Sequence, residues 1–115
     1  MNRGAGWSPV TEEADALCVI QIESRGAVDD AREIAAIEGA DVLFVGPNDL
    51  AVALGTKELP LDQIVDAARA EGKAAGILAR SREDADAAFE RGFRFVAVAS
   101  DSFLLAEAAR GIATR

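Results

Sequence analysis

Short apolar runs alternate with helix-like segments along this chain, and that alternation constrains its fold more than any other feature. The runs cover residues 17–22, 42–45, 74–79 and 95–99. Helical spacing of apolar residues follows each run, at 27–38, 60–72, 81–92 and beyond 101, with one or two further turns at 50–54. Strand–helix units of roughly 25 to 30 residues in strict alternation are typical of a parallel α/β sheet.

Four such units can close in two ways. One is a small open doubly wound sheet, and the other is half of an eight-stranded (β/α)₈ barrel, which needs about 250 residues when complete. The 115 residues are one domain's worth, with an irregular lead-in at 1–13 and the four units at 14–115. Periodicity alone does not choose between the two closures.

Composition excludes several classes of protein. The net charge of −8 argues against a nucleic-acid partner, because phosphate binding needs a basic face. The apolar runs are too short to span a membrane, and the first residues lack the apolar core of a signal peptide. The single cysteine, Cys18, lies in an apolar run, where we expect it to be buried and unreactive. These features predict a cytoplasmic protein.

Local sequence signals predict two helix caps and the position of one arginine. Ser81, three residues before Asp84, resembles a capping box that starts a helix. Asp101 or Ser102 is expected to cap the last helix. Arg80 follows the third apolar run, where it could face the mouth of a barrel, although a surface salt bridge is the preferred interpretation.

Two carboxylates each follow directly on an apolar run or its loop. Glu23 ends the first run, and Asp49 follows the second run within Gly-Pro-Asn-Asp-Leu. If the runs are neighbouring parallel strands, both carboxylates emerge at the sheet end where α/β proteins place their chemistry. Two carboxylates there could hold a hard divalent cation. The alternatives are a plain Glu23–Arg25 pair and Asp49 as the N-cap of the turns at 50–54.

Four segments together resemble a known family. They are Gln21-Ile22-Glu23-Ser24, the stretch 38–50 with its Gly-Pro-Asn-Asp-Leu loop, the stretch 72–77 and the stretch 95–101. In order and spacing they resemble the HpcH/HpaI aldolases, which are class II, metal-dependent enzymes acting on 4-hydroxy-2-oxo acids. The resemblance implies the C-terminal half of a (β/α)₈ barrel, with these units as strands five to eight.

The resemblance also implies roles for particular residues. Glu23 and Asp49 match the carboxylates that hold Mg²⁺, Mn²⁺ or Co²⁺, and Asp49 and Gln21 lie where pyruvate binds. Asn48 stands where a backbone N–H meets the substrate carboxylate. The family's catalytic histidine and clamping arginine lie on earlier strands, and this sequence has no histidine. We therefore expect no catalytic residue in this chain, and Arg3 is not that clamp.

The resulting functional prediction is a carbon–carbon lyase. It would cleave 4-hydroxy-2-oxo acids to pyruvate and an aldehyde through a metal-stabilised enolate, with the chain incomplete alone. Expected partners are the keto acid and either further copies of the chain or a complementing N-terminal half-barrel. Family members exchange C-terminal helices, so the segment 103–114 is expected to pack on a neighbour. The alternatives are an inactive half-barrel or assembly subunit with a vestigial metal site, and a CoA-thioester lyase relative.

Overall fold

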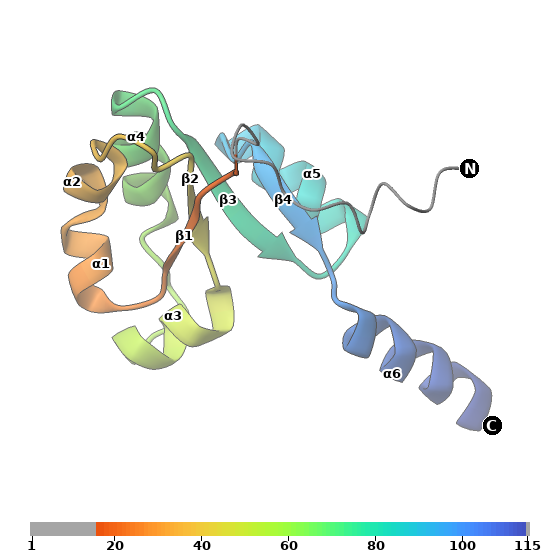
Figure 1. Ribbon diagram of the computed structural model, residues 1–115. Coiled ribbons are helices and arrows are strands. Elements are labelled where there is room, and N and C mark those ends of the chain that lie inside the picture. Colours follow the sequence, from red (N-terminus) through yellow and green to blue (C-terminus); the bar gives the residue numbers. More distant parts are fainter. Residues whose placement is uncertain (1–15, 115) are drawn as a thin grey trace, which may run out of the picture.

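The computed structural model describes residues 16–114, so Arg3 and the predicted lead-in at 1–13 lie outside the described residues. Within them, four parallel strands form one sheet: β1 (Val19–Ile22), β2 (Val42–Val45), β3 (Ala74–Ala79) and β4 (Phe95–Val98). The helices of the same part of the chain are α1 (Arg25–Asp29), α2 (Ala31–Ala35), α3 (Pro47–Leu54), α4 (Leu61–Ala70), α5 (Arg82–Arg91) and α6 (Asp101–Ala113) (Figure 1).

The strand order decides between the two closures that the sequence left open. The strands lie in the order β1-β2-β3-β4, and each neighbouring pair is parallel. A doubly wound sheet reverses its strand order at a switch point and carries helices on both faces. This sheet has no reversal within residues 16–114, so its strands follow one another as they do in a (β/α)₈ barrel.

The hydrophobic core lies between one face of the sheet and the helices. Alternate strand residues point to that face, among them Ile22, Leu43, Val45 and Ile77, and they join one buried cluster with residues of the helices. Phe93, just before β4, is the largest of the fully buried side chains. The helix residues in the cluster are Val28, Ala31, Ala35, Leu50, Ile64, Val65, Ala67, Ala68 and Ala88.

The opposite face of the sheet is the one that would line a barrel. Phe44, Gly76 and Phe95 form one row across β2, β3 and β4 on that face. The rings of Phe44 and Phe95 meet edge to face, with centroids 6.0 Å apart, over the glycine between them. Phe95 is 38% exposed and Leu78 is 36% exposed, because no described element covers this face.

Helix boundaries follow the caps more closely than the apolar pattern. The predicted helix at 27–38 is two short helices, α1 and α2, separated at Asp30 (φ −94°, ψ 12°). Helix α1 begins early because the Ser24 side chain accepts a hydrogen bond from the Ala27 N–H, at 3.1 Å. The predicted cap at Ser81 is confirmed, since its Oγ accepts from the Asp84 N–H at 3.1 Å.

Two other expectations were wrong. Ser100, not Asp101 or Ser102, caps α6, and its Oγ accepts from the Phe103 N–H at 3.3 Å. Cys18 is exposed rather than buried, because it precedes the first paired residue of β1. Its backbone N–H donates to Asp41 Oδ2 at 2.8 Å, which anchors the entry to the sheet.

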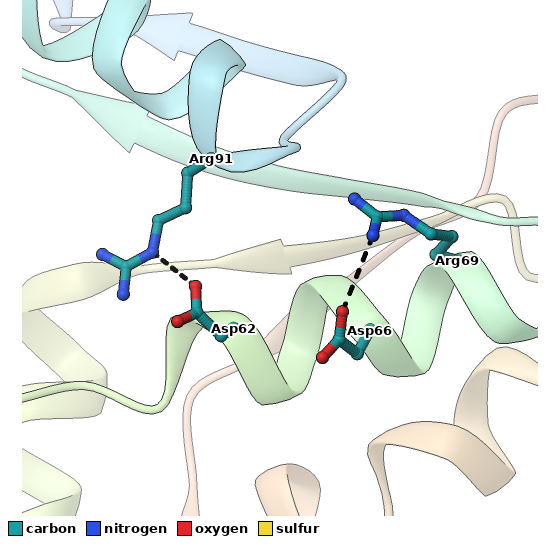
Figure 2. A network of polar contacts seen from close by, with 4 residues as sticks. All are labelled: Asp62, Asp66, Arg69 and Arg91. Atoms are coloured by element: carbon teal, nitrogen blue, oxygen red, sulfur yellow. Dashed lines mark hydrogen bonds and ion pairs between the residues drawn. The ribbon is translucent and has the colours of Figure 1, made fainter.

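An exposed ion pair links α4 to α5. Figure 2 shows Arg91, at the end of α5, reaching Asp62 on α4, with 2.7 Å between Nε and Oδ1. The hydrogen bond from Arg91 lowers the pKa of Asp62, and the same bond raises the pKa of Arg91. The second pair in the figure, Asp66 with Arg69 at 3.8 Å, lies within α4 and is looser. Only the Asp62–Arg91 pair joins two helices, and both pairs belong to the helix layer.

Helix α6 leads away from the sheet (Figure 1). Its apolar side chains are exposed: Leu105 by 73% and Ile112 by 87%. Nothing in residues 16–114 covers them, and α6 contributes no buried residue. No helix in this part of the chain is both long enough and apolar enough to cross a membrane.

Candidate metal and substrate site at the carboxyl end of the sheet

Glu23 lies at the carboxyl end of β1, one residue past Ile22. Ile22 is fully buried against the helices, so its neighbours Gln21 and Glu23 belong to the opposite, barrel-lining face. Both are exposed. Ile22 pairs with Val45, so Glu23 and Gly46 occupy equivalent positions just beyond their strands. Gln21 and Glu23 therefore share one face of the sheet, because a strand alternates its side chains between its two faces.

Asp49 follows β2 in the first turn of α3, and its side chain turns back over the loop. Its Oδ2 atom lies 3.7 Å from the point that a Cβ on Gly46 would occupy. Gly46 is the residue beside Glu23 in the neighbouring strand, so Asp49 and Glu23 are directed to the same end of the sheet. The 3.7 Å separation is an ordinary van der Waals distance, so the carboxylate lies against the loop backbone at Gly46.

The two simpler explanations of these carboxylates are wrong for this structure. Glu23 forms no ion pair with Arg25 or with any other described cation. Asp49 is not an N-cap, because α3 begins at Pro47 with Gly46 as its cap. Asp49 is the third helical residue, where a negative charge is favoured by the helix dipole. Neither carboxylate is neutralised by a basic side chain of residues 16–114.

The donor set fits a hard cation with open coordination positions. Two carboxylates supply hard oxygen ligands, and Mg²⁺ is commonly held by one or two carboxylates with waters and substrate completing an octahedral shell. Within residues 16–114 there is no group of three or more His, Cys, Asp or Glu side chains placed to hold a metal. Glu23 and Asp49 would thus form a two-carboxylate site that is open to a chelating ligand, and they would not form a closed structural one.

Asn48 and Arg80 make a contact that the sequence did not predict. The Nη2 atom of Arg80 donates to Oδ1 of Asn48 across 3.3 Å, joining the first turn of α3 to the end of β3. The salt bridge expected for Arg80 is absent from residues 16–114. Its position two residues after Leu78 on the barrel-lining face was the available signal, because alternate strand residues share a face.

Clefts surround this contact at the carboxyl end of the sheet. One, of about 310 Å³, is lined by Asn48, Leu78, Arg80, Ser100 and Phe103. Ala99 also lines it, and this residue has φ 62°, in the left-handed region that costs energy for a residue with a Cβ. Strained backbone of this kind is frequent at functional sites. A second cleft, of about 440 Å³, extends from Asn48 and Arg80 along α3.

Comparison with known proteins shows which proteins this chain resembles. Residues 3–108 match the family model described as HpcH/HpaI aldolase/citrate lyase. The chain is 38% identical over 128 residues to the hydroxypyruvate/pyruvate aldolase of Chromohalobacter salexigens, covering 100% of this chain and 50% of that protein. It is 45% identical over 91 residues to the 5-keto-4-deoxy-D-glucarate aldolase of Shigella boydii, covering 72% of this chain and 35% of that protein.

The fold recurs in solved structures as well. A HpcH/HpaI aldolase/citrate lyase family protein from Burkholderia cenocepacia superposes with a TM-score of 0.79 at 33% identity. The match covers 98% of this chain and 46% of that one. The chain thus spans about half the length of the relatives that it matches, and the sheet described above corresponds to half of their structure.

Proposed function

The chain belongs to the HpcH/HpaI aldolase/citrate lyase family, and on that premise we propose that it carries the metal-binding half of a class II aldolase. The reaction is cleavage of a 4-hydroxy-2-oxo acid to pyruvate and an aldehyde. The observation that carries the proposal is the pair of carboxylates without cationic partners: Glu23 beyond β1, and Asp49 folded over Gly46 beyond β2. Both lie at the strand ends where barrel enzymes place their chemistry.

Glu23 and Asp49 would hold Mg²⁺, Mn²⁺ or Co²⁺ in the proposed site. When bound, such an ion supplies Lewis-acid stabilisation of the negative charge that develops on the oxo group of the substrate. Both carboxylates are exposed, and the open coordination positions suit a ligand that binds through two oxygens. The role of the chain's own side chains is to fix where those oxygens lie.

Gln21 and Asn48 are proposed to orient the keto acid. Gln21 is one pleat before Glu23 on the same face, and its side-chain amide can donate to a ligand oxygen. Asn48 is the second residue of α3, and the first N–H groups of a helix have no acceptor within the helix. Such N–H groups favour a carboxylate. The side chain of Asn48 instead accepts the hydrogen bond from Arg80.

The proposed reaction needs two groups of the family that have no counterpart in this chain. A base must take the proton from the 4-hydroxyl of the substrate, and neutral imidazole is a common choice, yet the sequence has no histidine. A cation to clamp the keto acid would also have to come from the preceding strands of the barrel. Four further strand–helix units would supply both, because they would complete the ring around the same mouth.

The uncovered surfaces support association with such units. The barrel-lining face exposes Phe95 and Leu78, and β1 and β4 each pair on one side only within the described residues. Unpaired edges and an exposed apolar face favour association. The partner would be a first half-barrel or further copies of the chain, with the apolar residues of α6 packing on a neighbouring subunit.

Complementation tests the proposal directly. The purified chain would be mixed with the first four strand–helix units of the Chromohalobacter aldolase, and pyruvate release from a panel of 4-hydroxy-2-oxo acids would be followed by a coupled assay. We expect activity with Mg²⁺ or Mn²⁺ in the mixture. Activity should be lost in Glu23→Gln and Asp49→Asn and kept in Glu33→Gln, an exposed carboxylate on α2. No activity from a folded mixture would contradict the proposal.

A second candidate is a non-enzymatic half-barrel with a vestigial metal site, which the absence of histidine favours. Mn²⁺ titration of the chain distinguishes the two. Equal Mn²⁺ affinity in the unaltered chain, Glu23→Gln and Glu33→Gln would support the non-enzymatic candidate. A loss of affinity confined to Glu23→Gln and Asp49→Asn would support the aldolase. The family's description also names citrate lyase, and a related CoA-thioester lyase would cleave malyl- or citryl-CoA in the same mixture.

A further inference from the structure

A basic cleft lies at the amino end of the sheet, opposite the end that carries the two carboxylates. It has a volume of about 310 Å³ and opens between the last turns of α4 and α5 and the entries of β3 and β4. Binding pockets for small molecules begin at about this volume. Among the described residues its lining includes three cations, no carboxylate and some apolar surface. The lining residues that bear on a ligand are Arg69, Lys73, Arg94, Phe89 and Val65.

Strand alternation directs two of the cations to the helix side of the sheet. Ala75 belongs to the buried cluster beneath the helices, so Lys73, two residues before it, shares that face. Val96 packs against the same cluster, and Arg94 is two residues before it. The Arg94 N–H donates to the Ala75 oxygen at 2.9 Å, which sets the entries of β3 and β4 side by side. The side chains of Lys73 and Arg94 therefore leave neighbouring strands on one face.

Most of the positive charge in this cleft is not neutralised by the described chain. No carboxylate of residues 16–114 pairs with Lys73 or Arg94. Glu71, which is close to Lys73 in the sequence, pairs with Arg32 instead, at 3.1 Å. The third cation, Arg69, forms one loose ion pair of 3.8 Å within its own helix (Figure 2). In a chain of net charge −8, such a cleft concentrates positive potential locally.

The hydrogen-bond donors of these cations are only partly used. The Lys73 ammonium has three donors, and its Nζ contacts the backbone oxygens of Ala40 at 2.5 Å and Ile37 at 3.3 Å. The Arg94 side chain donates to no group of residues 16–114, so its five N–H donors are available. The Arg69 guanidinium lies against Gly92, where a Cβ would be only 2.7 Å from Nη2. A larger residue at that position would displace this guanidinium.

The ends of two helices account for part of the positive charge. Helices α4 and α5 both end at the cleft, and the carboxyl end of a helix carries about half a negative charge, which attracts cations. Two such ends offset about one of the three positive charges. The surplus of roughly two charges matches a phosphate monoester, which carries about −1.5 to −2 at neutral pH.

We propose that this cleft binds a phosphate ester that carries a planar ring, such as a nucleoside monophosphate. The phosphate lies among Arg94, Lys73 and Arg69, since the fork of an arginine pairs with two phosphate oxygens. The ring lies against Phe89, which lines the cleft and is 51% exposed. Aromatic side chains stack on nucleobases in this way. The proposal does not depend on the aldolase function, because the cleft and the carboxylates are at opposite ends of the sheet.

Calorimetric titration of the full chain in EDTA tests the proposal. EDTA prevents a divalent ion at the carboxylates from holding the phosphate. The probes are AMP, ribose 5-phosphate and adenosine, which present both parts of the ligand, the phosphate alone and the ring alone. We expect AMP to bind about 5-fold more tightly than ribose 5-phosphate, because its base stacks on Phe89. Adenosine should bind at least about 10-fold more weakly than AMP, because it makes no charge-assisted hydrogen bonds.

Variants assign the binding to this cleft. Arg94→Gln should weaken both phosphate esters about 10-fold and leave adenosine unchanged. Phe89→Leu keeps an apolar side chain but removes the ring, so it should reduce the affinity for AMP to that for ribose 5-phosphate. The matched control is Arg80→Gln, which removes an exposed arginine without an ion pair in residues 16–114 at the other end of β3. This control should keep every affinity. Far-ultraviolet circular dichroism establishes that each variant is folded.

Several outcomes would overturn the proposal. One is equal affinity for AMP and adenosine, and another is an affinity for AMP that is kept in folded Arg94→Gln. A loss of AMP binding in Arg80→Gln would place the phosphate at the other end of the sheet. Equal binding of AMP and ribose 5-phosphate, unchanged in Phe89→Leu, would exclude the ring contact. Absence of AMP binding at millimolar concentration would exclude the site as a whole.

Discussion

Gly76 is the position in the sheet where adding one methyl group should be most disruptive. It lies between Phe44 and Phe95 in the row across β2, β3 and β4. A Cβ at this position would lie 2.7 Å from Phe44 Cδ2 and 2.9 Å from the backbone oxygen of Phe95. Ordinary carbon contacts begin near 3.4 Å, so the methyl group overlaps a ring on one side and the main chain of β4 on the other.

The expected cost of Gly76→Ala is about 1–3 kcal/mol of the free energy of unfolding. Extra volume in a packed region costs this much when the neighbours cannot move freely, and the Phe95 oxygen belongs to a strand paired with β3. Replacing glycine with alanine also restricts the unfolded chain, which contributes about 0.4–1 kcal/mol in the opposite direction. The overlap should outweigh that gain because one of the atoms that the methyl group meets is backbone.

Urea unfolding followed by far-ultraviolet circular dichroism measures the effect. The matched control is Gly26→Ala in α1, where a Cβ would meet nothing within 4 Å, and this variant should be as stable as the unaltered chain or slightly more so. Adding Phe44→Leu to Gly76→Ala should give less destabilisation than the two single changes summed, because a smaller side chain relieves one overlap. An unfolding free energy within about 0.5 kcal/mol of the unaltered chain for Gly76→Ala would refute the reasoning.

Three further predictions concern the helix layer and α6. Asp62→Asn should lower the urea midpoint at pH 6, and the difference should shrink as the pH falls toward 3. The reason is that the Arg91 hydrogen bond lowers the pKa of Asp62 in the folded state. The stabilisation from this carboxylate is therefore present above the pKa of Asp62 in the unfolded chain and is lost as the pH falls through its pKa in the folded chain. A difference between the two midpoints that grows on acidification would contradict this. Ser81→Ala should cost about 1 kcal/mol in the same unfolding assay by removing the cap on Asp84 N–H, and Ser81→Thr should cost less. Leu105→Glu should change the unfolding free energy of the chain at low concentration by less than about 0.5 kcal/mol, since Leu105 is 73% exposed, but it should weaken self-association in sedimentation experiments if α6 packs on a neighbour.

Much of the architecture could be predicted from local sequence signals. The strands at 42–45 and 74–79 have the predicted bounds, because short continuous apolar runs between helical segments are typical of buried parallel strands. Gly92 closes α5 with φ 112°, a conformation that glycine adopts without strain. Glu23 and Asp49 could be predicted to emerge at one sheet end because each follows directly on a strand or its loop, and position along the chain suffices for that placement; their role as metal ligands stays a prediction.

The sequence by itself determined the strand–helix alternation, the parallel sheet and the end of the sheet at which the carboxylates emerge. These depend on periodicity and on caps, which are encoded within a few residues. Only the tertiary structure decided the strand order, the position of Asp49 inside α3 and the contact between Asn48 and Arg80. The last of these joins residues 32 positions apart. Such contacts depend on which strands pair and in which register, and packing over the whole sheet sets both.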